Sequence, residues 1–418
     1  MATIQKIQRK GGTVYKITVS GGTDHTGKQI RRYMTWTPPQ GLNARQIAKE
    51  VKKVAYEFEH QFDTGMDVGN RQTFEAYSQY VIDLKSNPDR EGGCKHNTIV
   101  LYKRLRTNLL PLIGSVPIRD FSSQRLNALY DILSQTKAKK WARQPDGELK
   151  SVETDRTLSP KTVKEYHNFI SAVLEQAVQD RILPYNPAHS AKPPKRNKTK
   201  VRSYELEEIT AIRQAAASEP LHWQVMINLF LVSGCRRGEL AGLEWSRVDF
   251  EHSCMEISKN LCYTSERGIY VDTPKTATSA RLVGLPPEMM EQLLRLRREQ
   301  LEHRLMLGDR WQESDYVFTA SEGGPINPSY ITTYFRRFSQ RHHLPHLNPH
   351  AFRHTCASQL IAKGNDIVVV AEMLGHAEAS TTLNVYSHAI QESKKRAVAC
   401  MSDLLQETDA GKGDKRAL

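Results

Sequence analysis

The sequence predicts a multidomain, mainly α protein in which small β-sheets accompany the helices. A chain of 418 residues exceeds what one compact core usually holds, so two or three domains are expected. Near the N-terminus apolar residues alternate with polar ones, as they do in strands, whereas farther along they recur at helical spacing. Hydrophobic residues make up 39% of the chain, which is enough to form several cores.

The composition favours a polyanionic partner. The formal net charge is +13 at pH 7, which suits nucleic acid or an anionic membrane surface. No basic amphipathic anchor helix and no long apolar run are found, so we expect DNA or RNA and no membrane partner. The N-terminus lacks the apolar core of a signal peptide. The six cysteines show no CxxC spacing, which argues against zinc and a disulfide framework and fits a reducing cytosol.

Residues 1–68 are expected to form a small sheet followed by one helix. Strands are predicted over 15–19 and 30–36, and apolar residues at helical spacing follow from Ile47 to Phe62. Residues 1–36 carry seven Lys or Arg against one acid, and a basic sheet can enter a DNA major groove. A solvated edge sheet is the alternative. The candidate DNA-binding residues here are Lys16, Lys28, Arg31 and Arg32.

Residues 72–188 show four apolar stripes at helical spacing and predict a four-helix bundle. The polar stretch 137–158 between the third and fourth helices is expected to be a loop. A basic linker, 189–202, follows and contains no acidic residue, so it can lie along a DNA backbone. Its candidate DNA-binding residues are Lys195, Arg196 and Lys198.

Residues 203–406 are expected to form an α-rich mixed domain with a small β-sheet near 254–285, and residues 407–418 a flexible tail. An apolar stripe on Val398, Met401 and Leu405 predicts a short helix near the end. Such a helix needs a partner surface, either on its own domain or on a neighbouring subunit.

Basic and nucleophilic residues gather in four short segments of the mixed domain. Arg236 and Glu239 lie one helical turn apart after a flexible Gly234. The other segments hold Lys275 in a turn between strands predicted at 269–273 and 280–285, His350 and Arg353 on one helix face, and His376 followed by Tyr386.

Each segment alone has an ordinary structural explanation, such as a helix ion pair, a solvated lysine or a half-buried tyrosine. His350 and His354 have the i, i+4 spacing of a zinc-protease helix, but Ala351 stands where that motif needs Glu. No third ligand is evident, so no metal site is expected. The complete order Arg, Lys, His-x-x-Arg, Gly-His, Tyr is far more specific than any of its parts.

That order resembles the tyrosine recombinase (phage integrase) family, over the whole of residues 203–406. The four predicted helices resemble the core-binding domain of the family. The N-terminal sheet and helix resemble the arm-type DNA-binding domain of integrases from conjugative transposons and some temperate phages. The resemblance implies catalytic roles for Arg236, Glu239, Lys275, His350, Arg353, His376 and Tyr386.

The resemblance also implies the chemistry. Tyr386 would attack a phosphodiester and form a 3′-phosphotyrosyl link, and the bond energy kept in that link would allow resealing without ATP, metal or another cofactor. Arg236 and Arg353 would hold the non-bridging oxygens, and His376 would donate a further hydrogen bond. His350 would act as the base and Lys275 would protonate the departing 5′ oxygen.

The family resemblance predicts an integrase that acts on core and arm-type sites of double-stranded DNA, through a Holliday junction in a homotetramer. Excisionase or a DNA-bending accessory protein is a candidate partner, and the bacterial cytoplasm, at the nucleoid, is the expected location. The alternatives are a chromosome-dimer resolvase of the same family, a type IB topoisomerase and a DNA-binding regulator without catalysis.

Overall fold

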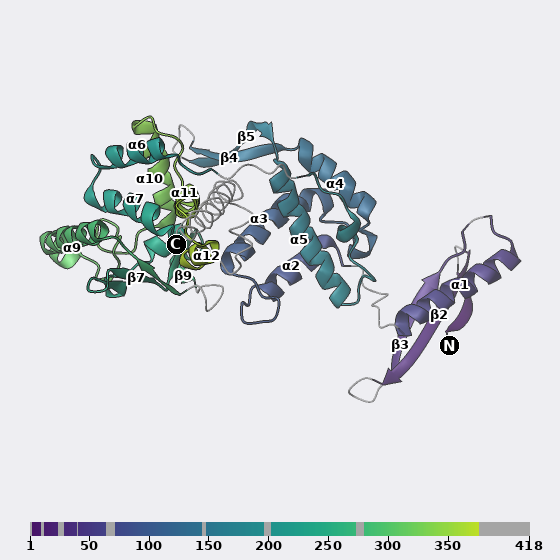
Figure 1. Cartoon of the computed structure of the whole chain (residues 1–418). Coiled ribbons are helices and arrows are strands. Elements are labelled where there is room, and N and C mark those ends of the chain that lie inside the picture. Colours follow the sequence, from purple (N-terminus) through teal and green to yellow (C-terminus); the bar gives the residue numbers. More distant parts are fainter. Residues whose placement is uncertain are drawn as a thin grey trace, which may run out of the picture. The chain divides into compact units, whose positions relative to one another are not determined.

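The computed structural model describes residues 2–9, 12–23, 29–39, 41–63, 72–143, 148–195, 202–272 and 280–375. Contacts divide the chain into two units, Met1–Lys198 and Thr199–Leu418. Among these residues the first unit has separate cores under an N-terminal sheet and within a helical bundle, and the second has one large and one small core. The predicted fold class, multidomain and mainly α with small sheets, is confirmed (Figure 1).

The N-terminal part is an antiparallel sheet covered by one helix, as predicted, but the sheet has a third strand, β1 (Thr3–Arg9), that the sequence pattern did not indicate. Ile17 and Val19 are buried against Val51, Ala55 and Phe58 of the helix. Because strand residues alternate between faces, the intervening residues form a second face that the helix does not cover. The elements, in the order β1-β2-β3 and then helix, are β1 Thr3–Arg9, β2 Gly12–Thr23, β3 Gln29–Trp36 and α1 Ala44–Asp63.

Four helices form the bundle that the apolar stripes predict, and Thr73, Ser122 and Ser159 cap the N-termini of three of them. The second stripe, Tyr102, Leu105, Leu109 and Leu112, predicts the buried face of α3 (His96–Ile113). It is wrong at its last position, because Leu112 is 43% exposed and Ile113 is buried in its place. The helices are α2 Phe74–Lys85, α3 His96–Ile113, α4 Ser123–Gln135 and α5 Pro160–Gln179, with 3₁₀ turns at Ile118–Asp120 and Pro187–Ser190.

The prediction of a loop over 137–158 is wrong. The stretch forms an antiparallel ribbon of β4 (Lys137–Arg143) and β5 (Leu149–Thr157) with a register shift between Lys137 and Lys139. None of the ribbon side chains that the structure describes is buried. A ribbon with two solvated faces needs no apolar alternation, so the sequence signal on which strand prediction depends is missing.

The second unit is built around α7 (Leu221–Ser233), most of whose side chains are apolar and none of whose side chains is exposed. This helix contacts α6 (Leu206–Ala216), α9 (Pro287–Leu307) and α11 (Pro349–Ala362). Phe230 of α7 packs against Phe335 and Phe352, with ring centroids 5.6 and 6.0 Å away. The remaining helical elements are α8 Arg237–Ala241, α10 Pro328–Arg341, α12 Ile367–Leu374 and the 3₁₀ turns Trp245–Arg247 and Gly308–Arg310.

The expected β-rich stretch near 254–285 is present, but the two strands predicted on either side of Lys275 are not partners. The strand after residue 280 does not pair with the strand before 273; the two belong to different sheets. One sheet has the order β10-β7-β6 and the other is the hairpin β8-β9. The strands are β6 Val248–Asp249, β7 Cys254–Ile257, β8 Asn260–Thr264, β9 Gly268–Asp272 and β10 Arg281–Gly284.

Candidate active site

Arg236 and Glu239 are placed by the sharp junction between α7 and α8. Helix α7 ends because Gly234 adopts left-handed angles (φ 59°, ψ 21°), which glycine tolerates best. Arg236 is the N-cap residue of α8, and its backbone N–H donates to Glu239 Oε2 over 2.8 Å. Its guanidinium Nη1 donates to Glu239 Oε1 over 2.6 Å. The pair predicted from the i, i+3 spacing is therefore formed.

Glu239 also binds a second arginine that sequence reasoning missed. Arg281 Nη2 of β10 donates to Glu239 Oε2 over 2.9 Å, and both side chains are only 7% exposed. Burial pushes the Glu239 pKa upward, but hydrogen bonds and charges from Arg281 and Arg236 outweigh it and lower the pKa to about 2. Glu239 is thus a carboxylate at any physiological pH, and it orients two arginines.

Arg353 lies on α11 and is the most deeply buried arginine of the site, since only 3% of the residue is exposed. Its Nη1 donates to the Gly234 carbonyl (2.9 Å) and its Nη2 to the Leu374 carbonyl (2.7 Å). Burial and the nearby charge of Arg236 lower the Arg353 pKa to about 10, which leaves the guanidinium charged at pH 7.

Three arginines, Arg236, Arg281 and Arg353, meet at the C-terminal end of α12, and we refer to them as the arginine cluster. Carbonyls at the end of a helix have no partner within the helix and carry the negative end of its dipole, so cations are stabilised there. Three consecutive carbonyls each receive one arginine. The pairs are Arg281 Nε to Met373 (2.8 Å), Arg353 Nη2 to Leu374 (2.7 Å) and Arg236 Nη2 to Gly375 (3.0 Å).

Gly375 fits closely into this arrangement. Its left-handed conformation (φ 67°, ψ 47°) ends α12, and a Cβ there would lie 2.9 Å from Arg281 Nη1. A side chain at this position would therefore press on the arginine cluster. The Leu-Gly-His segment noted in the sequence is held directly by the cluster through Leu374 and Gly375.

His350 and Arg353 lie on α11, whose N-terminus is capped by the Asn348 side chain. His350 is exposed, and partial desolvation together with the charges of Arg353 and Arg236 lowers its pKa. A neutral imidazole at pH 7 suits a proton acceptor. His354 packs 5.6 Å from the His350 ring, and burial and His350 lower its pKa to about 4. Within the described ranges no group of three metal-ligating side chains occurs.

Three predicted catalytic residues, Lys275, His376 and Tyr386, lie outside the described residues. So do three of the predicted DNA-binding residues, Lys28, Arg196 and Lys198, and the expected C-terminal helix. Their roles remain predictions from the sequence.

Tyr330 and Tyr334 would be the next nucleophile candidates if Tyr386 were not used. Tyr334 is 7% exposed, donates its hydroxyl to Glu219 and stacks on Trp223 with centroids 3.5 Å apart. Burial and the Glu219 hydrogen bond raise the Tyr334 pKa. A phenol held in this way is a poor nucleophile, whereas Tyr330 is 47% exposed.

The N-terminal candidates divide between the two faces of the sheet. Lys16 of β2 pairs with Thr35 and Arg31 pairs with Ser20, so both belong to the face that α1 leaves uncovered. Lys16 lies 4.6 Å from the ring centre of Tyr33 on this face. Arg32 pairs with Val19 and is therefore on the other face, although its side chain is exposed. Lys195 is exposed after the bundle.

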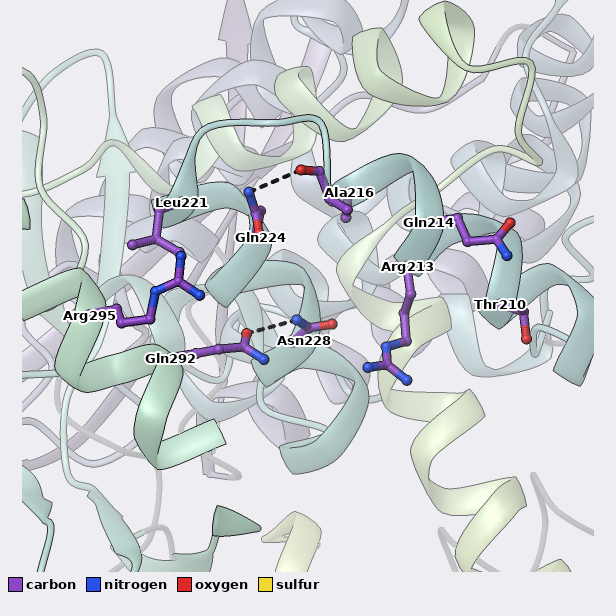
Figure 2. Close-up of a pocket in the computed structure, with 10 residues that line it drawn as sticks. Thr210, Arg213, Gln214, Ala216, Leu221, Gln224, Asn228, Gln292 and Arg295 are labelled. Atoms are coloured by element: carbon purple, nitrogen blue, oxygen red, sulfur yellow. Dashed lines mark hydrogen bonds between the residues drawn. The ribbon is translucent and has the colours of Figure 1, made fainter. Parts of the chain in front are cut away.

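A pocket of about 440 Å³ lies among α6, α7 and α9 and contains Arg213 and Arg295 (Figure 2). Asn228 donates to Gln292 across it over 2.8 Å. None of the predicted catalytic residues lines this pocket. The candidate active site is therefore the arginine cluster. In addition, none of the helices that the structure describes is long and apolar enough to span a membrane.

Comparisons with known proteins agree with the resemblance noted in the sequence. The model of the phage integrase family matches residues 201–393. A tyrosine recombinase XerC-like protein of Caldanaerobacter subterraneus is 31% identical over 263 residues, which cover 59% of this chain and 67% of that protein. The ICEBs1 integrase of Bacillus subtilis is 27% identical over 248 residues, with the same coverage.

Solved structures show a similar fold. The Tn1549 transposon integrase, in a complex with transposon right end DNA, matches 78% of this chain and 98% of its own at a TM-score of 0.63 and 20% identity. A lambda integrase dimer bound to a COC′ core site matches 91% of this chain and 94% of its own at a TM-score of 0.51 and 15% identity.

Proposed function

Because the chain belongs to the phage integrase family of tyrosine recombinases, we propose that it integrates and excises a mobile DNA element by cleavage and rejoining through Tyr386. The observation that carries this function is the arginine cluster. It holds three guanidinium groups against one carboxylate, Glu239, within the described part of the chain. A site with two surplus positive charges suits a phosphodiester that gains negative charge in the transition state.

In the proposed step one bond to phosphorus forms and one breaks, and one proton is transferred at the attacking oxygen and one at the leaving oxygen. The Tyr386 oxygen bonds to phosphorus and gives its proton to neutral His350, while the bond from phosphorus to the 5′ oxygen breaks. Lys275 gives a proton to that oxygen. The products are a 3′-phosphotyrosyl link and a free 5′ hydroxyl, and the reverse step reseals DNA without an energy source.

The two family arginines contribute differently. The Arg236 side chain is 40% exposed and is the member of the cluster that a phosphate can reach most readily. Arg353 is buried and has two of its donors engaged with carbonyls. We propose that Arg353 supplies charge from behind the site and that His376, next to Gly375, donates to the same phosphate.

An integrase is preferred over a chromosome-dimer resolvase because of the N-terminal sheet and α1. Lys16 and Arg31 on the uncovered sheet face support binding to arm-type DNA sites, and Lys195 supports a backbone contact beside the core site. We propose a homotetramer on a Holliday junction, aided by an excisionase or a DNA-bending protein. The reaction would take place at the nucleoid, in the cytoplasm.

A nicked suicide substrate tests this function, because loss of a short 5′ fragment traps the covalent protein–DNA link. Wild-type protein should form the adduct, and Tyr386→Phe should form none while binding the same DNA with an affinity within about threefold of wild type. Tyr330→Phe is the matched control, since it removes an exposed phenol hydroxyl from the same unit and should leave the adduct unchanged. An adduct with Tyr386→Phe would show that another residue is the nucleophile.

A further inference from the structure

We propose that Arg281 is a positioning residue of the cleavage site, which holds Glu239 and the end of α12 so that Arg236 faces the scissile phosphate. The proposal depends on the proposed function and assigns a role to a residue outside the family motif quoted above. Arg281 acts through other residues, and it contacts no reacting atom in this scheme.

The side chain of Arg281 is buried and holds elements from distant parts of the sequence. Its backbone belongs to β10, opposite Ile257 of β7. Its Nη2 donates to Glu239 Oε2 (2.9 Å) and approaches Cys235 Sγ (3.7 Å), and its Nε donates to the Met373 carbonyl (2.8 Å). One planar guanidinium thus joins the start of α8 to the end of α12, a geometry that lysine cannot reproduce with a single nitrogen.

Glu239 links Arg281 to Arg236, because its carboxylate binds both residues. Oε1 of Glu239 accepts from Arg236 Nη1, and Oε2 is shared between the Arg236 backbone N–H and Arg281. If Arg281 is removed, Oε2 loses its buried cationic partner and the carboxylate can turn away from the Arg236 guanidinium. Arg236 would then lose the orientation that bidentate phosphate binding requires.

The second contact acts on the segment before His376. Arg281 Nη1 is buried and has no hydrogen-bond partner among the residues that the structure describes. It lies so close to Gly375 that a Cβ there would be 2.9 Å away. The guanidinium group of Arg281 therefore packs against the backbone at Gly375 and helps to fix the position of the last described residues before His376.

The pH dependence of cleavage distinguishes a positioning role of Arg281 from a role in stabilising the fold alone. The charged and titratable groups around Glu239 are Arg236 and Cys235 at the start of α8, Arg281 on β10 and Arg353 on α11. Against the raising effect of burial, Arg281 is the strongest influence that keeps the Glu239 pKa low. Without Arg281 the Glu239 pKa rises, so protonation at mildly acidic pH should weaken the hold on Arg236.

Single-turnover cleavage of a suicide substrate, with protein saturating the DNA, is measured from pH 5.5 to 8.5 on the full chain. Arg281→Met should cleave at least about tenfold more slowly at pH 8 than wild type, and its rate should fall further as the pH drops, with a midpoint above that of wild type. Arg281→Lys keeps the charge and should recover part of the rate. The double variant Arg281→Met/Glu239→Gln has no carboxylate to protonate at position 239, so its cleavage rate should not show the additional fall at acidic pH.

Arg247→Met is the matched control, because it removes an exposed Arg–Glu pair with Glu256 in the same unit and should leave rate and pH profile unchanged. DNA affinity and unfolding temperature are measured for every variant. The proposal is overturned if Arg281→Met keeps the wild-type rate and profile. It is also overturned if the cleavage rates of Arg281→Met and Arg281→Lys fall only as far as their lower DNA affinity or their smaller folded fraction explains. A wild-type chain that forms no adduct would contradict the proposed function itself, whereas equal cleavage by wild type and Arg281→Met contradicts this inference alone.

Discussion

Replacing Gly234 by alanine should destabilise the second unit through two separable effects. The φ angle of +59° is unfavourable for a residue with a Cβ and costs about 1–2 kcal/mol. The new Cβ would also lie 2.5 Å from Leu374 Cδ2 and 3.3 Å from Cys356 Sγ. Crowding of this kind in a packed core costs about 1–3 kcal/mol. After a gain of about 0.5 kcal/mol from a stiffer unfolded chain, the free energy of unfolding should fall by about 3 kcal/mol.

Two other glycines of the same unit separate strain from crowding. Gly268 has φ +67° with nothing within 4 Å of its ideal Cβ, so Gly268→Ala should cost only about 1 kcal/mol. Gly284 has neither a positive φ nor a close neighbour, so Gly284→Ala should be neutral or slightly stabilising. For a unit of this size, 1 kcal/mol corresponds to about 2–4 °C in unfolding temperature.

Calorimetry of the full chain measures the series. The transition of the second unit is identified by tryptophan fluorescence in a Trp36→Phe/Trp141→Phe background, which keeps Trp223, Trp245 and Trp311. The unfolding temperature should drop by about 6–12 °C for Gly234→Ala and about 2–4 °C for Gly268→Ala. Leu374→Val removes the crowding atom and should therefore be less harmful in the Gly234→Ala background than alone. Equal shifts for Gly234→Ala and Gly268→Ala, or additive effects of Gly234→Ala and Leu374→Val, would refute the close-contact reasoning.

Four further outcomes are expected. Lys275→Ala should cleave a normal phosphodiester far more slowly than a 5′-bridging phosphorothioate, whose thiolate leaves without an acid; equal defects on both substrates would remove Lys275 from that role. Glu239→Gln should lower the free energy of unfolding by about 3 kcal/mol at pH 7, because the lowered Glu239 pKa stabilises the fold above about pH 4 and this stabilisation is lost as pH falls towards 2. Urea unfolding at pH 7 and pH 3 checks this, and an unchanged difference would contradict it. Deleting residues 1–68 should preserve cleavage of core sites and weaken binding to arm-type sites in gel shifts, so that undiminished arm-site binding would mean a wrong domain assignment. Truncation after residue 392 should keep half-site binding but abolish cooperative full-site assembly in native gels; normal cooperativity would show that the C-terminal segment does not bridge subunits.

The sequence was informative where chemistry depends on local spacing. An i, i+3 spacing was enough to place His350 and Arg353 together on α11, and Arg236 beside Glu239 at the start of α8. Such pairs need only the helical repeat, which is a property of consecutive residues.

Features that depend on long-range contacts were not predictable in this way. Arg281 meets Glu239 across 42 positions of sequence, and strand alternation gives no sign that Arg281 is buried while its neighbour Leu282 is 69% exposed. The β4–β5 ribbon was missed because its strands are mainly polar and show no regular alternation of apolar and polar residues. The β10 strand was recognised, but its partner β7 is separated from it by the β8–β9 hairpin, and sequence pattern does not select partners.

The burial of the arginine cluster affects how the protein responds to ionic strength. Mobile ions screen charges at the surface but reach buried ones poorly, and Arg281 and Arg353 are almost entirely enclosed. The field at the cleavage site should therefore persist in concentrated salt, although the DNA contacts proposed for exposed residues such as Arg31 and Lys195 should weaken steeply. Salt would then govern how long the protein stays on DNA and leave the speed of strand cleavage in the bound complex nearly constant. A cell could accordingly adjust occupancy of the element ends through counterions without altering the chemistry performed there.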